Sequence, residues 1–175
     1  MNAPQPLAPS AIAALLEAQA TTILKEIQAL PAEVCTWQPA AGEWSINDVL
    51  GHLLEAERRG FNGRIRTLLE QDTPSLPGWD QEVVAAERRD RGRDTAALLS
   101  EFTDLRTDSI ALVRGLQPDQ LGRSGTHELV GTIGVNDLLH EWVHHDRNHV
   151  KQLLSVVQSY VRPSMGNCRR FEELE

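Results

Sequence analysis

The longest regular pattern in this 175-residue chain is an apolar seam near its C-terminal end, and it limits the fold more than any other feature. From Val135 to Val161 the seam positions recur at steps of three and four residues, which is the repeat of one face of an α-helix. These positions are Leu138, Trp142, His145, His149, Leu153, Val156 and Tyr160. The spacing predicts a long helix over residues 135–161 that packs along one side in a protein core.

Three other segments carry apolar residues at the same spacing and predict three more long helices, at residues 10–30, 45–70 and 94–116. Ser45 followed by Asp48 has the pattern of a capping box, in which each side chain binds the backbone N–H of the other residue. The second helix should therefore begin at Ser45. With four such helices and no convincing strand pattern, we predict an all-α fold.

A long connection should separate the second and third of these helices. Residues 71–93 are rich in proline, glycine and charge, and they leave room for one short helix near residues 81–89. A connection of this length in a compact domain usually crosses the bundle or forms part of a site. Its arginines would bind an anion or, as we favour, pair with neighbouring acids on a solvated face. Residues 122–134 should form a flexible approach to the last helix.

The chain is long enough to bury a full core without stabilisation by a metal ion or disulfide bonds. Pro163 should end the last helix. We expect one domain over residues 1–163 and a polar tail over residues 164–175.

The net charge of −8 argues against nucleic acid as a partner, because phosphate binding needs a basic surface. We expect no membrane-spanning segment and no signal peptide. Two cysteines, Cys35 and Cys168, form no disulfide framework, which favours a reducing cytoplasm.

Four of the six histidines lie between His140 and His149. Only His145 and His149 lie on the apolar seam. His144 is rotated about 100° around the helix from the seam, and His140 also lies to one side of it. Two neutral imidazoles buried without partners would each cost on the order of a few kcal/mol of polar desolvation. A metal ion would remove this cost, and so would hydrogen bonds to buried backbone or to neighbouring carboxylates.

A third imidazole is available at His52, on the inner edge of the helix predicted for residues 45–70. Its neighbours along that edge are small, which leaves space for a ligand or for another backbone. A lone histidine there would more often be an ordinary core residue. Together with His145 and His149, it makes a set of three neutral nitrogens, which is typical of catalytic metal sites with an open position. Zinc suits this set, and nickel, iron or manganese also accept imidazole ligands.

Asp146 lies beside the first of the paired histidines and has two possible roles. His145, Asp146 and His149 have the spacing of the zinc-protease pattern H-E-x-x-H, with Asp in place of Glu. As a general base, the shorter carboxylate would have to reach the water that it activates. Supporting a ligand imidazole through a hydrogen bond is easier to place, so we favour this role for Asp146.

Two blocks of the chain resemble the DinB-like (DinB/YfiT) superfamily. The first is WQPAAGEWSINDVLGHL at residues 37–53, continued by residues 57–65, and the second is residues 127–134 together with WVHHDRNHVKQL at residues 142–153. The resemblance covers almost the whole chain up to the tail. It implies a compact four-helix bundle, a homodimer, and His52, His145 and His149 as ligands of zinc, nickel or a similar divalent ion.

The resemblance implies less about activity. Characterised members include metal-dependent transferases and isomerases that use low-molecular-weight thiols such as bacillithiol or mycothiol, and others are described as hydrolases or as products induced by DNA damage. We expect a cytoplasmic, metal-dependent, thiol-using transferase that acts on a small molecule, with a hydrolase as the close variant. No cysteine lies near the predicted site, so a cosubstrate would have to supply the thiol. The alternative is a non-catalytic, stress-induced protein that binds a metal or small ligand.

Overall fold

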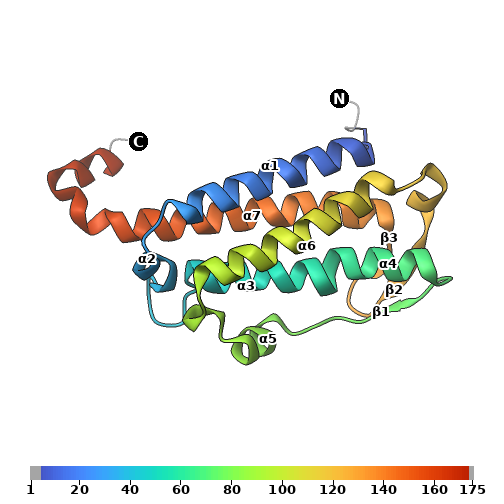
Figure 1. The fold of residues 1–175 in the computed structure, drawn as a ribbon, viewed down its shortest axis with the longest axis horizontal. Helices are drawn as coiled ribbons and strands as arrows, with labels where there is room; N and C mark the ends of the chain where they lie inside the picture. The colour runs from blue at the N-terminus through green and yellow to red at the C-terminus, as the bar shows by residue number, and fades with distance from the viewer. Residues whose placement is uncertain (1–4, 174–175) are drawn as a thin grey trace.

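The computed structural model describes residues 5–173, and its main feature is a bundle of four long helices (Figure 1). The second of these helices runs without a break through a π-helical segment, η1. The bounds are α1 (Pro9–Gln28), α3 (Ile46–Glu55) with η1 (Ala56–Phe61) and α4 (Asn62–Glu70), α6 (Thr95–Gly115) and α7 (Val135–Val161). The predicted all-α class, the four-helix bundle and the long connection between its second and third helices are confirmed.

The four helices are arranged so that α3 faces α7. Helix α1 packs against α6 and α7, and α3 also packs against α6 and α7. Figure 1 shows that α1 and α7 run in one direction, while α3–α4 and α6 run in the other. The connection from α4 to α6 therefore runs back along the bundle.

Local sequence signals set the helix ends that matter for the site. Ser45 caps α3, since its hydroxyl accepts from the backbone N–H of Asp48, and the Asp48 carboxylate accepts from the backbone N–H of Ser45. Helix α7 begins and ends at the predicted residues, Val135 and Val161. The long buried face of α7 places its histidines opposite α3.

The core is divided into two apolar clusters along the length of the bundle. On α6 the change from one cluster to the other falls between Phe102 and Ile110, and on α7 it falls between Trp142 and Leu153. The residues between these limits include buried polar side chains of both helices, Arg106 and Asp146 among them. A polar layer therefore crosses the bundle at mid-length, and it is at this level that the histidines of α7 lie.

The stretch before α7 differs from the prediction. We expected a flexible approach, but residues 122–134 contain a hairpin of β2 (Ser124–His127) and β3 (Gly131–Gly134), and β1 (Ser75–Leu76) pairs in parallel with β2. A side chain at Gly125 would lie 2.5 Å from the backbone oxygen of Pro74, so glycine permits the close approach of β1 and β2. These strands are short and contain little apolar residue alternation, which is why their pattern was not recognised.

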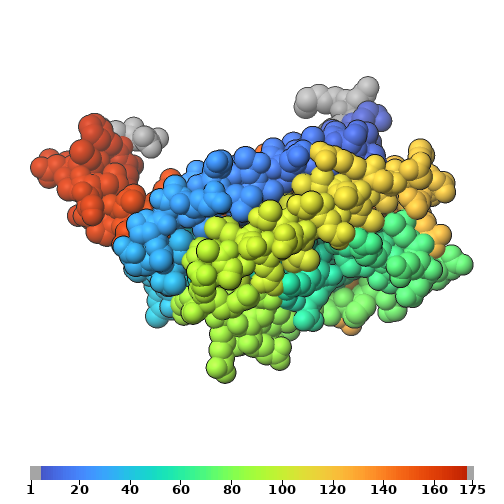
Figure 2. Space-filling model, in the orientation of Figure 1, coloured from blue at the N-terminus to red at the C-terminus, as the bar shows by residue number. Residues whose placement is uncertain are grey.

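The remaining elements are short helices on the outside of the bundle. They are α2 (Ala32–Thr36), α5 (Gln81–Arg88), η2 (Asp90–Gly92), η3 (Pro118–Gly122) and η4 (Arg162–Glu173). Helix α5 matches the short helix predicted within the long connection. Residues 164–173 of the predicted polar tail belong to η4, which forms 3₁₀-helical turns and stands clear of the bundle in the space-filling view (Figure 2), while residues 174 and 175 lie outside the described residues. No helix within residues 5–173 has the combined length and hydropathy of a membrane span.

Candidate metal centre

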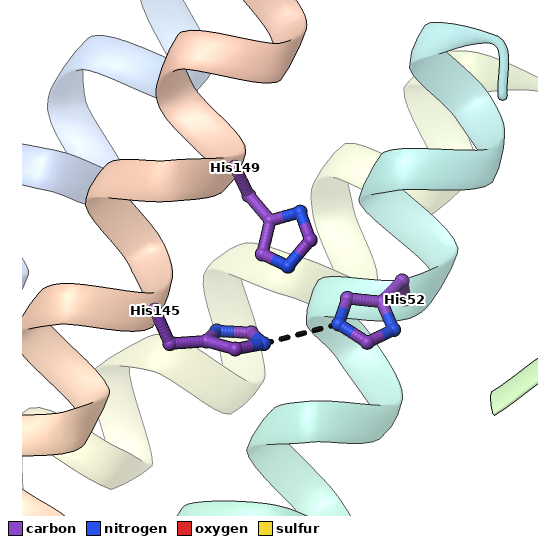
Figure 3. A group of neighbouring side chains, drawn as sticks. All are labelled: His52, His145 and His149. Carbon is purple, nitrogen blue, oxygen red and sulfur yellow. Dashed lines mark hydrogen bonds between the residues drawn. The ribbon is translucent and has the colours of Figure 1, made fainter. Parts of the chain in front are cut away.

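The structure brings together the three predicted histidines at the interface of α3 and α7. His52 comes from α3, His145 and His149 come from successive turns of α7, and the rings point toward one another (Figure 3). One ring nitrogen of each residue lies within 4.8 Å of the corresponding nitrogens of the other two. The closest approach is 3.0 Å, between Nε2 of His52 and Nε2 of His145. All three side chains are half-buried.

Burial favours the neutral form of the His52 and His149 rings. Desolvation, followed by repulsion from His149 and His145, lowers the pKa of His52 from 6.5 to about 3. Desolvation and then His145 also lower the pKa of His149, although Gln152 and Asp146 oppose this shift. At neutral pH, His52 and His149 therefore carry no charge, and each has a nitrogen lone pair available.

The hydrogen bonds of the rings fit a metal ion. Nδ1 of His149 donates to Oε1 of Gln152 at 2.8 Å, which leaves the lone pair of its Nε2 for another partner. Zinc binds imidazole nitrogens at about 2.0–2.1 Å, so two nitrogens on a tetrahedral ion lie about 3.3 Å apart. The 3.0 Å between the Nε2 atoms of His52 and His145 is close to this spacing. A donor set of three imidazoles therefore suits a first-row divalent ion.

Aromatic rings surround the histidines. The indole of Trp44 lies 5.2 Å from the His52 ring, and that of Trp79 stacks against the same ring at 5.7 Å. Phe61 meets the His145 ring edge-on at 5.1 Å. Trp79 comes from the long connection, and it was not placed at the site from the sequence. These rings limit the contact of His52 and His145 with water.

A pocket of about 510 Å³ lies beside the histidines, and His149 forms part of its wall. The rest of the wall comes from α7, from the loop before α3 and from the start of α5. It contains Pro39, Gly42, Glu43, Trp44, Gln81, Glu82, Gln152, Ser155, Val156 and Ser159. Trp44 lines the pocket without filling it, and Trp37 packs instead against Tyr160. A small polar molecule has room here next to His149.

Asp146 lies beneath the site, where it is fully buried and paired with Arg106. Its Oδ2 accepts from Nη1 of Arg106 at 2.6 Å, and its Oδ1 lies 3.7 Å from Nδ1 of His145. Burial favours the protonated acid, but Arg106 and then His145 outweigh it and hold the pKa of Asp146 below its ordinary value of 3.8. Asp146 is thus a carboxylate that faces a ring of the site.

Arg106 was missed by the sequence analysis, although a signal for it exists. It lies within the buried stripe of α6, four residues after Phe102, and its side chain is only 2% exposed. A charged residue inside an apolar helical stripe predicts a buried partner of opposite charge. Its other partner is Glu57 of η1, whose Oε2 accepts from Nη2 of Arg106 at 2.8 Å.

The other histidines of the C-terminal cluster point away from the site. Nε2 of His140 accepts from the backbone N–H of Leu7, and its Nδ1 contacts the backbone oxygen of Asn136. His144 is exposed, and its Nδ1 lies 3.8 Å from the carboxylate of Glu141. Helical phase therefore distinguishes correctly between the histidines that converge and those that do not.

Three of the four arginines in residues 88–93 are paired with acids, as we favoured, and one of these pairs is Arg91 with Asp48. Arg88 bonds to Glu55 and to Asp90, and Arg93 bonds to Asp90 and to Glu101. Asp90 is buried against α3, and a side chain at Gly51 would clash with it. These pairs hold the connection, with Trp79 and α5, against the helix that carries His52.

Comparisons with known proteins agree with this architecture. No curated protein sequence matches the chain. The solved structure of YfiT from Bacillus subtilis, described as a probable metal-dependent hydrolase with an unusual four-helix bundle topology, is similar with a TM-score of 0.79. The alignment has 17% identity and covers 90% of this chain and 92% of YfiT, and at that identity it supports the fold alone. The sequence profile of the DinB superfamily matches residues 15–153, and the chain therefore belongs to the DinB superfamily.

Proposed function

We propose that this protein is a divalent-metal-dependent enzyme that acts on a small molecule, with His52, His145 and His149 as the metal ligands. The observation that carries the proposal is the convergence of three imidazoles from two helices beside a pocket of about 510 Å³. The 3.0 Å contact between Nε2 of His52 and Nε2 of His145 can be one N–H···N hydrogen bond, but this pairs only two of the three rings, whereas a metal ion would bind all three.

Three protein ligands leave at least one coordination position for a substrate, as in catalytic rather than structural sites. A bound ion would polarise a carbonyl oxygen and lower the pKa of a thiol or water that it binds. Zinc and nickel are the ions that we favour, and iron or manganese are alternatives that accept the same ligands.

The residues of the chain would prepare this site in separate ways. Gln152 orients the His149 ring by accepting a hydrogen bond from Nδ1 of His149. The rings of Trp44, Trp79 and Phe61 keep water from His52 and His145. The pocket offers amide and hydroxyl groups that can hold a polar substrate by hydrogen bonds. These groups belong to Gln81, Gln152, Ser155 and Ser159.

We assign Asp146 a supporting role rather than that of a general base. Its side chain is 1% exposed, and one of its oxygens is already bonded to Arg106. A base has to reach the proton of a substrate or water, directly or through one water molecule. The contact with Nδ1 of His145 fits a carboxylate that orients a ligand imidazole.

Among reactions, we propose transfer of an electrophilic group to a low-molecular-weight thiol. Cys35 is buried in α2 and Cys168 lies in the exposed η4, and neither lines the pocket, so the thiol would come from a cosubstrate. Both cysteines are free, which supports a reducing cytoplasm as the place of action. A homodimer remains part of the proposal on the basis of the family resemblance.

Hydrolysis is the second candidate, and the observation that favours it is the description of YfiT as a probable metal-dependent hydrolase. A third reading, a non-catalytic protein that binds a metal or small ligand, gains support only if no turnover is found. An activity panel separates the three.

In that panel, zinc- and nickel-loaded protein is incubated with bacillithiol, mycothiol or glutathione and an electrophile such as a chlorinated aromatic compound. Parallel samples contain activated esters or amides without a thiol. Thiol consumption that His145→Ala abolishes supports transfer, and ester or amide cleavage that depends on the same residue supports hydrolysis. If neither occurs, and the wild-type protein behaves as His145→Ala does, the enzymatic proposal is wrong and the binding role is favoured.

A further inference from the structure

The most unusual group outside the histidines is a buried ionic cluster of Arg106, Glu57 and Asp146. Nε and Nη2 of Arg106 bond to the Glu57 carboxylate at 2.8–3.1 Å, and its Nη1 bonds to Asp146 at 2.6 Å. The three side chains are only 1–2% exposed. Nη1 also reaches the backbone oxygen of Leu16, so the guanidinium of α6 touches α1, η1 and α7.

The fold by itself gives little reason for these charges. Taking three charged groups out of water is costly, and apolar side chains of similar volume often stabilise a core equally well. The surrounding layer already contains large apolar rings, since the guanidinium lies 4.9 Å from the ring centre of Phe102 and 5.7 Å from that of Trp142. The cluster also has two carboxyl groups for one guanidinium, and burial raises the pKa of the Glu57 carboxyl above its ordinary value, although Arg106 opposes this shift.

The cluster meets the histidines at one point, Asp146. While Oδ2 is held by Arg106, Oδ1 lies 3.7 Å from Nδ1 of His145. That Nδ1 is buried and has no hydrogen-bond partner among the described residues; Oδ1 of Asp146 is an acceptor that lies beside it, at 3.7 Å just beyond hydrogen-bond distance. An acceptor at Nδ1 fixes the proton there and leaves the lone pair on Nε2, the atom that faces His52.

We infer that Arg106 is a positioning residue of the metal centre: it holds the Asp146 carboxylate against Nδ1 of His145 and so sets the orientation and tautomer of that ring. The inference rests on the proposed ligation of a metal by His145. Glu57 anchors the other side of the guanidinium and does not contact the histidines. Arg106 thus acts on the metal only through Asp146.

Glu57 provides a matched control, because it forms an equally buried ion pair with the same arginine. Asp146→Asn and Glu57→Gln each replace one of the two carboxylates by an amide of nearly the same shape. A purely structural role predicts that the two changes have the same effect. A positioning role predicts that only the change at Asp146 alters the metal centre.

The test uses the full chain loaded with Co²⁺, whose visible absorption reports the ligands of the ion. The Co²⁺ dissociation constant is measured by competition with a chelator, and thermal unfolding of the metal-free proteins is measured alongside. We expect Asp146→Asn to weaken Co²⁺ binding by about 10- to 100-fold and to change the absorption spectrum. Glu57→Gln should lower the unfolding temperature but leave the Co²⁺ affinity and spectrum as in the wild type.

A double-mutant cycle tests whether Arg106 acts through Asp146. Arg106→Lys keeps the positive charge but loses the fork that binds both carboxylates. We expect it to weaken Co²⁺ binding in the wild-type background and to have no further effect in the Asp146→Asn background. Equal losses of affinity in both backgrounds, or equal losses in Asp146→Asn and Glu57→Gln, would overturn the inference. If the wild-type protein itself binds no Co²⁺ at its histidines, the proposed function fails as well, so the two failures are distinguishable.

Discussion

The Nε2 atoms of His52 and His145 lie 3.0 Å apart, although the two residues are separated by 93 positions in the chain. The capping box at Ser45 sets the start of α3, and the apolar seam of α7 turns His145 inward. Local sequence signals that are independent of each other thus position α3 and α7 so that their imidazoles lie close together.

Removal of a ligand should remove the metal. We expect about one divalent ion per wild-type chain after loading and desalting, and much less in His52→Ala or His149→Ala, because two imidazoles bind a divalent ion more weakly than three. His144→Ala is the control, since His144 is exposed and turned away from the site. The measurement is elemental analysis of the loaded proteins. Equal metal content in all four proteins would contradict the assignment.

Stability of the metal-free protein should depend on pH through His52. Its pKa is about 3 in the folded state and ordinarily 6.5, so between these values the unfolded chain binds more protons. The contribution of the neutral His52 ring to the unfolding free energy is fully present above pH 6.5. As the pH falls from 6.5 toward 3, the unfolding free energy decreases by at most about 1.4 kcal/mol per pH unit.

The comparison that isolates this contribution is urea unfolding of metal-free wild-type and His52→Gln protein between pH 4.5 and 6.5. The slope of the unfolding free energy against pH should be smaller in His52→Gln, because glutamine does not titrate. Parallel slopes would mean that the environment of His52 does not depress its pKa.

Gln152 should tune metal affinity without binding the metal. Its Oε1 accepts from Nδ1 of His149 at 2.8 Å, and partners of this kind typically contribute about 10- to 100-fold to affinity. We expect Gln152→Leu to weaken Zn²⁺ binding by such a factor and Gln152→Glu to restore it, as measured by competition with a chromogenic chelator. An affinity unchanged in Gln152→Leu would show that His149 needs no support from this side chain.

The pocket should control substrate binding independently of the metal. Ser155 lies in the pocket wall on α7 and is exposed. A bulky ring introduced by Ser155→Trp would occupy part of the pocket, so we expect a higher KM or a loss of activity in the thiol panel with unchanged metal content. Ser100→Trp on the exposed face of α6 is the control. Full activity of Ser155→Trp would place the substrate elsewhere.

Much of the site could be predicted from local sequence, and the rest could not for physical reasons. Helical phase selected His145 and His149 over His140 and His144, because one face of α7 is buried from Val135 to Val156. The predicted seam extends too far at its end, since Tyr160 is exposed. The stripe of α6 marks Arg106 as buried, but its partners, Glu57 and Asp146, could not be identified, because they lie 49 and 40 positions away and no local pattern joins them.

The features of the fold that the sequence analysis did not predict have a similar cause. The hairpin of β2 and β3 is built from short segments with little apolar alternation, and it is stabilised by pairing with β1, some fifty positions earlier. Trp79 reaches His52 only because ion pairs such as Arg88–Glu55 hold the long connection against α3. Contacts of this kind become visible only once the helices are assembled.

The central claim is that His52, His145 and His149 bind one divalent ion and leave a position open. Anomalous diffraction from crystals of the zinc-loaded protein, measured at the zinc absorption edge, tests it most directly. We predict a single strong peak about 2.0–2.1 Å from one nitrogen of each of the three rings, with no fourth protein ligand. An absence of density between the rings, or an ion closed by a fourth side chain, would contradict the account.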